Sequence, residues 1–368
     1  MRKAVIILPT YNEVKNINNV IEKIFQVTKD IKNWDMHVVV VDSDSPDNTK
    51  NIVIELAKKN KNLHLLKTNK EGLGKAYIEG FKYTIEILKP FIVFEMDADL
   101  SHNPQDIPKF LNKIEKGADF VIGSRYIPGG TIPKDWGIER KFFSVVGNWI
   151  IRFGFMNLKV TDWTNGFRAI KTWIIKESLP KLENYTGYVF QVALLDNALK
   201  MGARVSEIPV VFVDRKEGVS KINSGQYTLQ TLWYIFKYSS FIKFVIVGVS
   251  GFIIDFGISF IFIELVHSAV WFGTMVSTEV AIISNFLLNN FWSFSHKKIK
   301  HSENNYIWSF LKFNVVSSGS ILIQTLGVSF ASSIFGREFW YIYKALIITF
   351  IIIPYSYILY NKFIWKDK

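Results

Sequence analysis

The first part of the chain alternates short apolar runs with longer amphipathic segments. The apolar runs end in polar clusters and are rich in Val, Ile and Phe, which is typical of buried strands. Strands are predicted at residues 5–8, 38–42, 63–66, 91–96 and 119–123. Helices are predicted between the first four runs, at residues 16–29, 48–60 and 74–88. This succession of strand, helix and strand predicts an α/β domain with buried parallel strands.

The last part of the chain has a different pattern, with four long apolar segments. They lie at residues 241–263, 269–292, 308–332 and 339–361. About 20 helical residues cross a bilayer core, so each segment is long enough to span it. Buried helices of a soluble protein are the alternative, but four such runs in series exceed what a soluble core holds. We therefore predict an all-α domain of four transmembrane helices at 241–368, joined to the first domain, 1–225, by an interfacial linker at 226–240.

The loops between the apolar segments differ in charge. The loop at 264–268 has no Lys or Arg, and the loop at 333–338 has only Arg337. The other side holds Lys297, Lys298, Lys300, Lys362, Lys366 and Lys368. Positively charged loops stay in the cytoplasm, and the apolar stretch at 4–8 is too short for a signal-peptide core. The first domain and both termini are therefore expected in the cytoplasm.

The amino-acid composition indicates which kinds of partner the protein can bind. The chain has 44 Lys and Arg against 32 Asp and Glu, a net charge of +12, which favours an anionic partner such as nucleic acid, phosphates or lipid head groups. Four membrane spans make nucleic acid a poor choice, so membrane lipids are the expected partner. The absence of cysteine excludes disulfides, cysteine-ligated zinc, iron–sulfur clusters and a cysteine nucleophile. The sequence does not indicate an oligomeric state.

Three charged residues fall inside the predicted membrane spans: Asp255, Glu279 and Lys344. Such charges are costly in lipid and usually face a partner or the interior of a helix bundle. Glu279 and Lys344 are one plausible pair. One interpretation is a polar path for a lipid head group; the favoured one is that these residues hold helices together.

Polar clusters follow three of the predicted strands, at residues 9–13, 42–47 and 97–99. Parallel sheets bind ligands beyond the carboxyl ends of their strands, so these clusters are the candidate site. The single Gly-x-Gly, at residues 72–74, has Tyr77 where a dinucleotide-binding fold needs a third glycine. No P-loop motif is present either, which argues against dehydrogenases and P-loop NTPases.

The sequence Asp97-Ala98-Asp99 is the central chemical feature. Two carboxylates spaced in this way in a turn can converge on one hard divalent cation. Mg²⁺ and Mn²⁺ prefer a few carboxylates together with phosphate oxygens from a ligand, and such a cation neutralises a diphosphate leaving group. The alternative is a capping turn, in which Ser101 or Asn103 begins the next helix.

The other two clusters have a chemical and a structural interpretation. Tyr11 offers a ring to a base, and Glu13 offers an acceptor to a ribose or base edge. Asp42 and Asp44 are placed to reach ribose hydroxyls or base N–H groups. Asp, Ser, Pro and Asn are also the residues that turns use, and for residues 45–47 the turn interpretation is favoured.

These clusters belong to a longer set of motifs in a familiar order. The set comprises LPTYNE (8–13), VVVDSDSPDNT (39–49), KEGLGKAYIEGF (70–81), MDADLSHNP (96–104), IGSRYIPGG (122–130), TNGFRA (164–169), GYVFQ (187–191) and FVDRKEGVSK (212–221). It resembles the family 2 glycosyltransferases with the GT-A (Rossmann-like) fold, and most closely the dolichol-phosphate mannose synthases. The stretches KFVIVGVSGFIIDF (243–256) and SNFLLNNFWSF (284–294) resemble the GtrA-like four-helix membrane domain.

The resemblance implies roles for individual residues. The nucleotide site is implied at Pro9, Tyr11, Glu13, Val41 and Ser43. The metal and the diphosphate are implied at Asp97, Ala98 and Asp99, with Ser101 as a further metal-facing side chain. The basic residues implied for the phosphates and the sugar are Arg125, Arg140, Arg215 and Lys221. Arginine binds phosphate bidentately and lysine acts as a point charge, which fits such roles.

The implied activity is inverting transfer of mannose from GDP-mannose to dolichyl or polyprenyl phosphate, assisted by Mg²⁺ or Mn²⁺. Two positions depart from the family pattern: Ser43 stands where an acidic residue is usual, and Ala193 where a Glu is common. A UDP-sugar donor is therefore an alternative, and a catalytically silent lipid-sugar scaffold or transporter is another. The aromatic-rich stretches at 142–158 and 226–237 are expected at the membrane interface, or otherwise as core helices.

Overall fold

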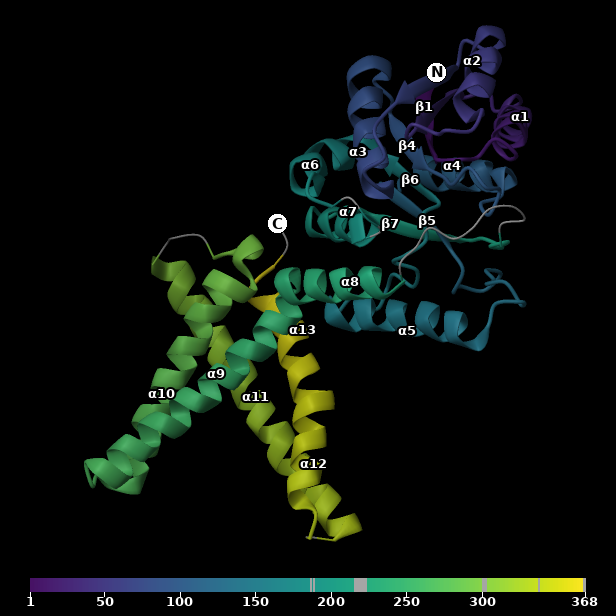
Figure 1. Cartoon of the computed structure of the whole chain (residues 1–368). Coiled ribbons are helices and arrows are strands. Elements are labelled where there is room, and N and C mark those ends of the chain that lie inside the picture. Colours follow the sequence, from purple (N-terminus) through teal and green to yellow (C-terminus); the bar gives the residue numbers. More distant parts are fainter. Residues whose placement is uncertain (186, 188, 215–223, 300–302, 337, 367–368) are drawn as a thin grey trace. The chain divides into compact units, whose positions relative to one another are not determined.

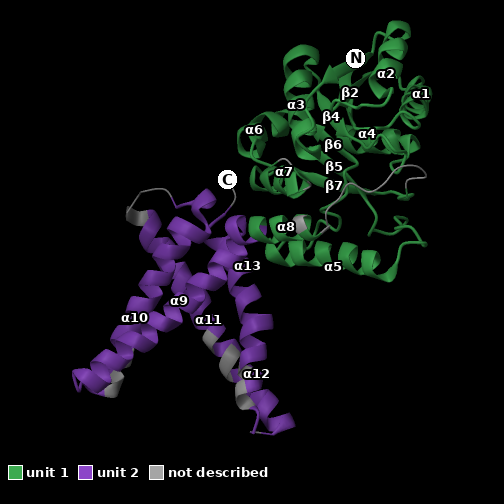
Figure 2. Cartoon of the chain, in the orientation of Figure 1, with its two compact units in different colours: residues 1–234 green, residues 235–368 purple. Residues whose placement is uncertain are grey.

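The computed structural model describes the chain except residues 186, 188, 215–223, 300–302, 337 and 367–368. The chain divides into two compact units, Met1–Tyr234 and Ile235–Lys368. Figure 2 shows the first as a mixed α/β unit and the second as a helical one.

Within its described residues, unit 1 is built on a seven-stranded sheet with the strand order β3-β2-β1-β4-β6-β5-β7 (Figure 1). The strands are β1 (Arg2–Thr10), β2 (Trp34–Asp42), β3 (Leu63–Lys67), β4 (Ile92–Glu95), β5 (Phe120–Ser124), β6 (Arg168–Lys171) and β7 (Val205–Pro209). Five of them overlap the predicted strands. The α/β fold is confirmed.

The expectation of parallel strands alone is wrong for β6, which pairs antiparallel with both β4 and β5. The apolar pattern did not predict β6, because this strand is short and begins with the buried Arg168. Since β6 runs against its neighbours, it begins at the edge of the sheet where β4 and β5 end. The segment that precedes it, residues 161–167, therefore lies between those two strand ends.

Helices cover both faces of the sheet (Figure 1). The helices that begin in unit 1 are α1 (Ile17–Thr28), α2 (Thr49–Lys59), α3 (Leu73–Tyr83, continued by a π-helical turn over Thr84–Leu88), α4 (Ile107–Glu115), α5 (Ile138–Gly154), α6 (Thr172–Leu182), α7 (Val189–Lys200) and α8 (Ser224–Tyr238). Alternate residues of β1, such as Ile6 and Leu8, belong to one core with Ile17 of α1 and Phe110 of α4. On the other face, α3 approaches the sheet closely at Gly80, where a Cβ atom would lie 3.0 Å from side-chain atoms of Ile7 and Val41.

Asp119, just before β5, joins three chain segments. Its carboxylate accepts hydrogen bonds from Lys171 Nζ (2.8 Å) and from the backbone N–H (3.0 Å) and Nε (3.1 Å) of Arg204. Burial alone would raise the pKa of Asp119, but the hydrogen bonds from Arg204 and Lys171 outweigh it and lower the pKa to about 2.

We expect Asp119→Asn to lower the free energy of unfolding by about 2 kcal/mol at neutral pH. The carboxylate stabilises the fold above its unfolded pKa near 3.8, and this contribution is lost as the pH falls towards 2. Thermal unfolding of the full chain in detergent should show a deficit of about 4–8 °C at pH 7 and roughly half of it at pH 3. An equal deficit at both pH values would contradict this account.

Unit 2 contains two helical hairpins (Figure 1). The first pairs α9 (Ser240–Phe260, continued by a π-helical turn over Ile261–Leu265) with α10 (Val270–Leu288, continued by a π-helical turn over Asn289–Ser293). The second pairs α11 (Glu303–Phe335) with α12 (Trp340–Ile347) and α13 (Ile353–Phe363), which a π-helical turn connects. Among the described residues, the helical runs Ser240–Leu265 and Ala345–Phe363 are long and apolar enough to cross a membrane.

Polar side chains join the first hairpin. Asp255 of α9 accepts hydrogen bonds from Ser277 Oγ (2.7 Å) and Thr278 Oγ1 (3.1 Å) of α10. Ser259 and Ser277 share a hydrogen bond of 2.6 Å. For Asp255, these contacts favour the helix-packing interpretation. The side chain of Lys344 lies outside the described residues, so its pairing with Glu279 stays a prediction.

Candidate active site

The carboxyl ends of β1, β2 and β4 meet at one edge of the sheet. These strands are adjacent and parallel, with Pro9 opposite Val41 and Ile7 opposite Glu95. The polar clusters that follow them are therefore neighbours, as the sequence predicted for a ligand site. Asp97 begins the cluster after β4.

The segment after β4 is a tight polar loop. The backbone N–H of Ser101 donates to Asp99 Oδ1 (3.0 Å), and Leu100 between them has a left-handed φ of 64°. A non-glycine residue in that region is strained by about 1 kcal/mol or more, which is common in functional sites. Of the two predicted capping residues, Asn103 takes the role: its Oδ1 accepts from the N–H of Gln105 (3.1 Å) at the start of a 3₁₀ turn over Pro104–Asp106.

The donors in this loop suit a hard divalent cation. Ser101 is buried and its Oγ has no hydrogen-bond partner, so it is an oxygen donor close in sequence to the two carboxylates of Asp97 and Asp99. Among the described residues, no group of three or more His, Asp or Glu is arranged to hold a metal by itself. Beside a nucleotide, Mg²⁺ or Mn²⁺ typically binds only a few protein oxygen atoms and keeps its other coordination positions for phosphate oxygens.

His102 links this loop to the next one. Its Nδ1 accepts from the backbone N–H of Asp97 (3.0 Å), so the ring proton belongs on Nε2, which lies 3.0 Å from Asn165 Oδ1. The ring stacks on Phe167 at 5.1 Å. Asn165 Nδ2 also donates to the carbonyl of Gly123. The end of β4 and the end of β5 are thus tied through the segment before β6.

A buried ion pair lies within the sheet, next to the loop that carries Asp97 and Asp99. Glu95 and Arg168 are opposite each other on β4 and β6, both fully buried, with Arg168 Nε 3.8 Å from Glu95 Oε2. Arg168 also donates to the backbone carbonyls of Trp163, Asn165 and Gln191. Burial raises the pKa of Glu95 to about 7, and the charge of Arg168 only partly offsets this. Sequence reasoning missed this pair, although Arg168 lies within the quoted TNGFRA motif.

The predicted nucleotide residues lie at the ends of β1 and β2. Lys70 Nζ sits 3.8 Å from the ring centroid of Tyr11, and Glu13 Oε2 accepts from Asn16 Nδ2 (2.9 Å). Ser43 is mostly buried, and its backbone N–H donates to the carbonyl of Thr10 (3.0 Å).

The predicted ribose contact of Asp42 is not supported. The buried carboxylate of Asp42 accepts from Ser45 N (3.0 Å), Ser45 Oγ (2.6 Å) and Thr10 Oγ1 (3.0 Å), so it stabilises the turn after β2. Asp47 likewise accepts from the backbone N–H groups of Val14 and Thr49. Turn chemistry, the alternative interpretation of this cluster, accounts for both residues.

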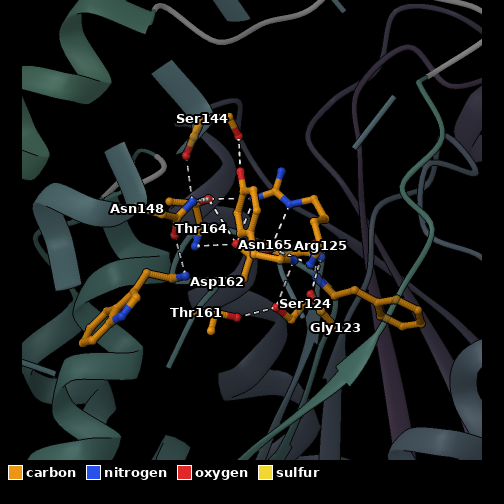
Figure 3. Close-up of polar contacts among 12 residues, drawn as sticks. Gly123, Ser124, Arg125, Ser144, Asn148, Thr161, Asp162, Thr164 and Asn165 are labelled. Atoms are coloured by element: carbon orange, nitrogen blue, oxygen red, sulfur yellow. Dashed lines mark hydrogen bonds and ion pairs between the residues drawn. The ribbon is translucent and has the colours of Figure 1, made fainter. Parts of the chain in front are cut away.

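Arg125 follows β5 and binds an aspartate that the sequence did not reveal. Its Nε and one terminal nitrogen donate to the two oxygens of Asp162 at 2.8 and 2.9 Å, and its backbone N–H donates to the same carboxylate (Figure 3). Both side chains are buried. Burial would raise the pKa of Asp162, but Arg125 outweighs it and holds that pKa below its usual value. The only sequence signal for Asp162 was its place two residues before the TNGFRA motif.

A cavity of about 830 Å³ opens beside Arg125. Its walls come from residues 130–135 and 211–214. Gly130 is required there, because a Cβ atom would collide with the carbonyl of Ser124. Arg140 stacks on Trp136 at 3.9 Å and pairs with Asp214, which lines the cavity, at 2.7 Å.

Both predicted arginines of this region, Arg125 and Arg140, are thus paired with carboxylates. The remaining two predicted basic residues, Arg215 and Lys221, lie outside the described residues.

The chain matches two known family profiles. Residues 5–181 match glycosyl transferase family 2, and residues 243–365 match the GtrA/DPMS transmembrane domain. The polyprenol monophosphomannose synthase of Mycolicibacterium smegmatis is 34% identical over 226 residues, which are 61% of this chain and 82% of that protein. The dolichol-phosphate mannosyltransferase of Pyrococcus furiosus is 31% identical over 332 residues, 87% of this chain and 88% of that protein.

Among solved structures, glucosyl-3-phosphoglycerate synthase from Mycobacterium tuberculosis, in complex with Mn²⁺, UDP and phosphoglyceric acid, aligns with a TM-score of 0.48 at 16% identity. The alignment covers 64% of this chain and 78% of that one. The sequence relatives confirm the resemblance seen in the motifs, and the second profile makes the chain a membrane protein. The chain is a glycosyltransferase of family 2, and its sequence relatives, together with its GtrA/DPMS transmembrane domain, place it in the branch of the dolichol-phosphate and polyprenol-phosphate mannose synthases.

Proposed function

We propose that this enzyme transfers mannose from GDP-mannose to the phosphate of a dolichyl or polyprenyl phosphate, with inversion, at the cytoplasmic face of the membrane. The observation that carries the proposal is the edge of the sheet: Asp97, Asp99 and the unpartnered hydroxyl of Ser101 share it with Arg125, which lines a cavity of about 830 Å³. The named relatives act on polyprenol or dolichol phosphate and mannose, by their names, and support the same substrates here.

The proposed transfer needs stabilisation of the leaving diphosphate's charge more than it needs a general base. A phosphate monoester has a second pKa of about 6, so the acceptor is already a dianionic nucleophile at neutral pH. A bound Mg²⁺ or Mn²⁺, held by Asp97, Asp99 and Ser101, would supply positive charge to the leaving diphosphate. The protein's own task is to orient the two anionic reactants and to screen them from each other.

The remaining roles follow the sequence motifs. We assign the nucleotide to Pro9, Tyr11, Glu13, Val41, Ser43 and the backbone of Ala98. We assign the phosphates and the sugar to Arg125, Arg140, Arg215 and Lys221. The geometry adds a condition for two of these: an incoming phosphate has to share Arg125 with Asp162, and Arg140 with Asp214. Guanidinium groups have five donors, so Arg125 can keep its aspartate and still offer a hydrogen to phosphate.

The acceptor is a lipid, so the site has to face a bilayer. Helix α5 exposes Phe142, Phe143 and Phe153, and it carries Lys141 and Arg152. Aromatic rings flanked by basic residues are typical of helices that lie at the head-group level. We propose that α5 rests there, with residues 1–225 as the catalytic domain, 226–240 as the linker and 241–368 as the membrane domain.

A donor panel tests the proposal. The purified chain in detergent is incubated with polyprenyl phosphate, Mn²⁺ and one of GDP-mannose, UDP-glucose, UDP-galactose or UDP-N-acetylglucosamine, and the lipid product is detected by mass spectrometry. Product from GDP-mannose is the expected result. No product from any donor, from protein that is folded and binds metal, would contradict the proposed activity.

One observation favours a UDP-sugar as a second candidate. Ser43 replaces the acidic residue usual at this position, and its side chain is mostly buried at the end of β2, so the carboxylate that would face the base is absent. Product from a UDP-sugar alone would select this candidate and keep the rest of the mechanism. Calorimetry with GDP and UDP gives the same decision without turnover.

A further inference from the structure

Asn148 is a buried polar residue on a helix whose exposed face is apolar. On α5, Phe143 is 65% exposed and Trp149 is 42% exposed, whereas Asn148 is 3% exposed. No step of the proposed reaction uses Asn148. A buried amide costs free energy unless its hydrogen bonds are met, so its partners indicate what it does.

Both ends of this amide bind the segment before β6. The backbone N–H of Trp163 donates to Asn148 Oδ1 (2.8 Å), and Asn148 Nδ2 donates to Thr164 Oγ1 (3.2 Å) and to the carbonyl of Ser144 (2.9 Å). A donor at one end and acceptors at the other fix the orientation of the amide. Figure 3 shows Asn148 between Ser144 and Thr164.

The same segment holds Arg125. Thr164 Oγ1 accepts from a terminal nitrogen of Arg125 (2.8 Å), and the same nitrogen, together with Nε, donates to Asp162, two residues earlier. A second link runs from α5 to the residue after Arg125, since Ser144 Oγ and Tyr126 OH lie 2.6 Å apart. Arg125 is therefore connected to α5 by two successive hydrogen bonds that meet at Thr164.

We propose that Asn148 is a positioning residue that couples the seating of α5 on a lipid surface to the placement of Arg125 at the cavity. This inference rests on the proposed function, in which α5 lies at a bilayer and the cavity takes a lipid phosphate. The bonds of Asn148 are shielded from water, so the segment 161–165 has to follow α5 when the helix settles. Arg125 is then ordered where its substrate arrives.

The first test needs no activity. Hydrogen–deuterium exchange of the full chain is compared in nonionic detergent and in bilayer discs containing phosphatidylglycerol. In the natural protein, the discs should slow exchange both in α5 and, by about tenfold, in residues 161–165. In Asn148→Ala, the slowing in α5 should remain and that in 161–165 should disappear. Equal slowing of 161–165 in both proteins, or none in the natural protein, overturns the coupling.

The second test measures transfer in the same discs. Asn148→Ala should raise the KM for polyprenyl phosphate by about 10- to 100-fold, the size expected for lost hydrogen bonds in a charged network, and leave the KM for the sugar nucleotide within about twofold. Thr164→Val, which keeps the shape of the side chain, should show the same split. Gly147→Ala is the matched control, because a Cβ there meets nothing within 4 Å.

The outcomes separate the two proposals. If the natural protein transfers no sugar from any donor, the proposed function fails and the exchange experiment still decides the coupling. If the natural protein is active and both variants lower kcat/KM for the two substrates alike, or change nothing, the coupling is wrong. The loss in the double variant Asn148→Ala/Thr164→Val should be well below the product of the single losses, because both act through one chain of bonds.

Discussion

Asp99→Asn is expected to lower sugar transfer by about 10³-fold and to leave the fold intact. The amide oxygen of an asparagine can still accept the N–H of Ser101, which Asp99 Oδ1 accepts at 3.0 Å, so the loop after β4 keeps its shape. The negative charge that would hold a divalent cation is lost. With the cation gone, the leaving diphosphate lacks its main charge partner.

Two measurements check this result. The first is the rate of sugar transfer from GDP-mannose. Both proteins are first stripped of metal with a chelator and then given Mn²⁺, which should restore transfer by the natural protein but not by the variant. The second is calorimetric binding of GDP with and without Mn²⁺. Asp30→Asn makes the same change of charge at an exposed position and should match the natural protein. Metal-dependent turnover within tenfold of normal in Asp99→Asn would refute the assignment.

The sequence predicted the strand ends well because burial leaves a plain signal there. The apolar runs inside β1 and β2, and the first three residues of β4, are continuous, as is typical of strands covered on both faces. The polar clusters after them were therefore placed at the right edge without knowledge of the tertiary structure. The tight turn in which Asp42 accepts hydrogen bonds could also be predicted, because its residues are those that turns use.

The contacts of the site that the sequence did not predict join residues that are far apart along the chain. Arg125 meets Asp162, 37 positions later, and Arg140 meets Asp214, 74 positions later. Neither spacing has a local pattern. The antiparallel strand β6 brings the first pair together, and its four residues carry too short an apolar signal to be seen. Sequence therefore identified the arginines as candidates and could not show that each one already holds a carboxylate.

The second large effect is expected at Asp162, in the stability of unit 1. Asp162→Asn keeps one acceptor oxygen, whereas the backbone N–H groups of Arg125 and Asn165 now donate to different oxygens of the carboxylate, at 3.1 Å each. It removes the only charge that Arg125 contacts as an ion pair in the described part of the chain. Leaving one partner of a buried pair uncompensated costs about 3–5 kcal/mol. Thermal unfolding followed by near-ultraviolet circular dichroism should shift down by about 6–20 °C.

The double variant Arg125→Met/Asp162→Asn separates charge from shape. Replacing both partners of a buried pair by uncharged groups is often close to neutral, so the double variant should unfold at a higher temperature than Asp162→Asn alone. Both variants should be inactive, because Arg125 is misplaced in one and absent in the other. Asp135→Asn, an exposed change beside the same cavity, should stay within about 0.5 kcal/mol of the natural protein. If the double variant is no more stable than the single one, the lost stability comes from packing and hydrogen bonding, and the unpaired charge of Arg125 is not its cause.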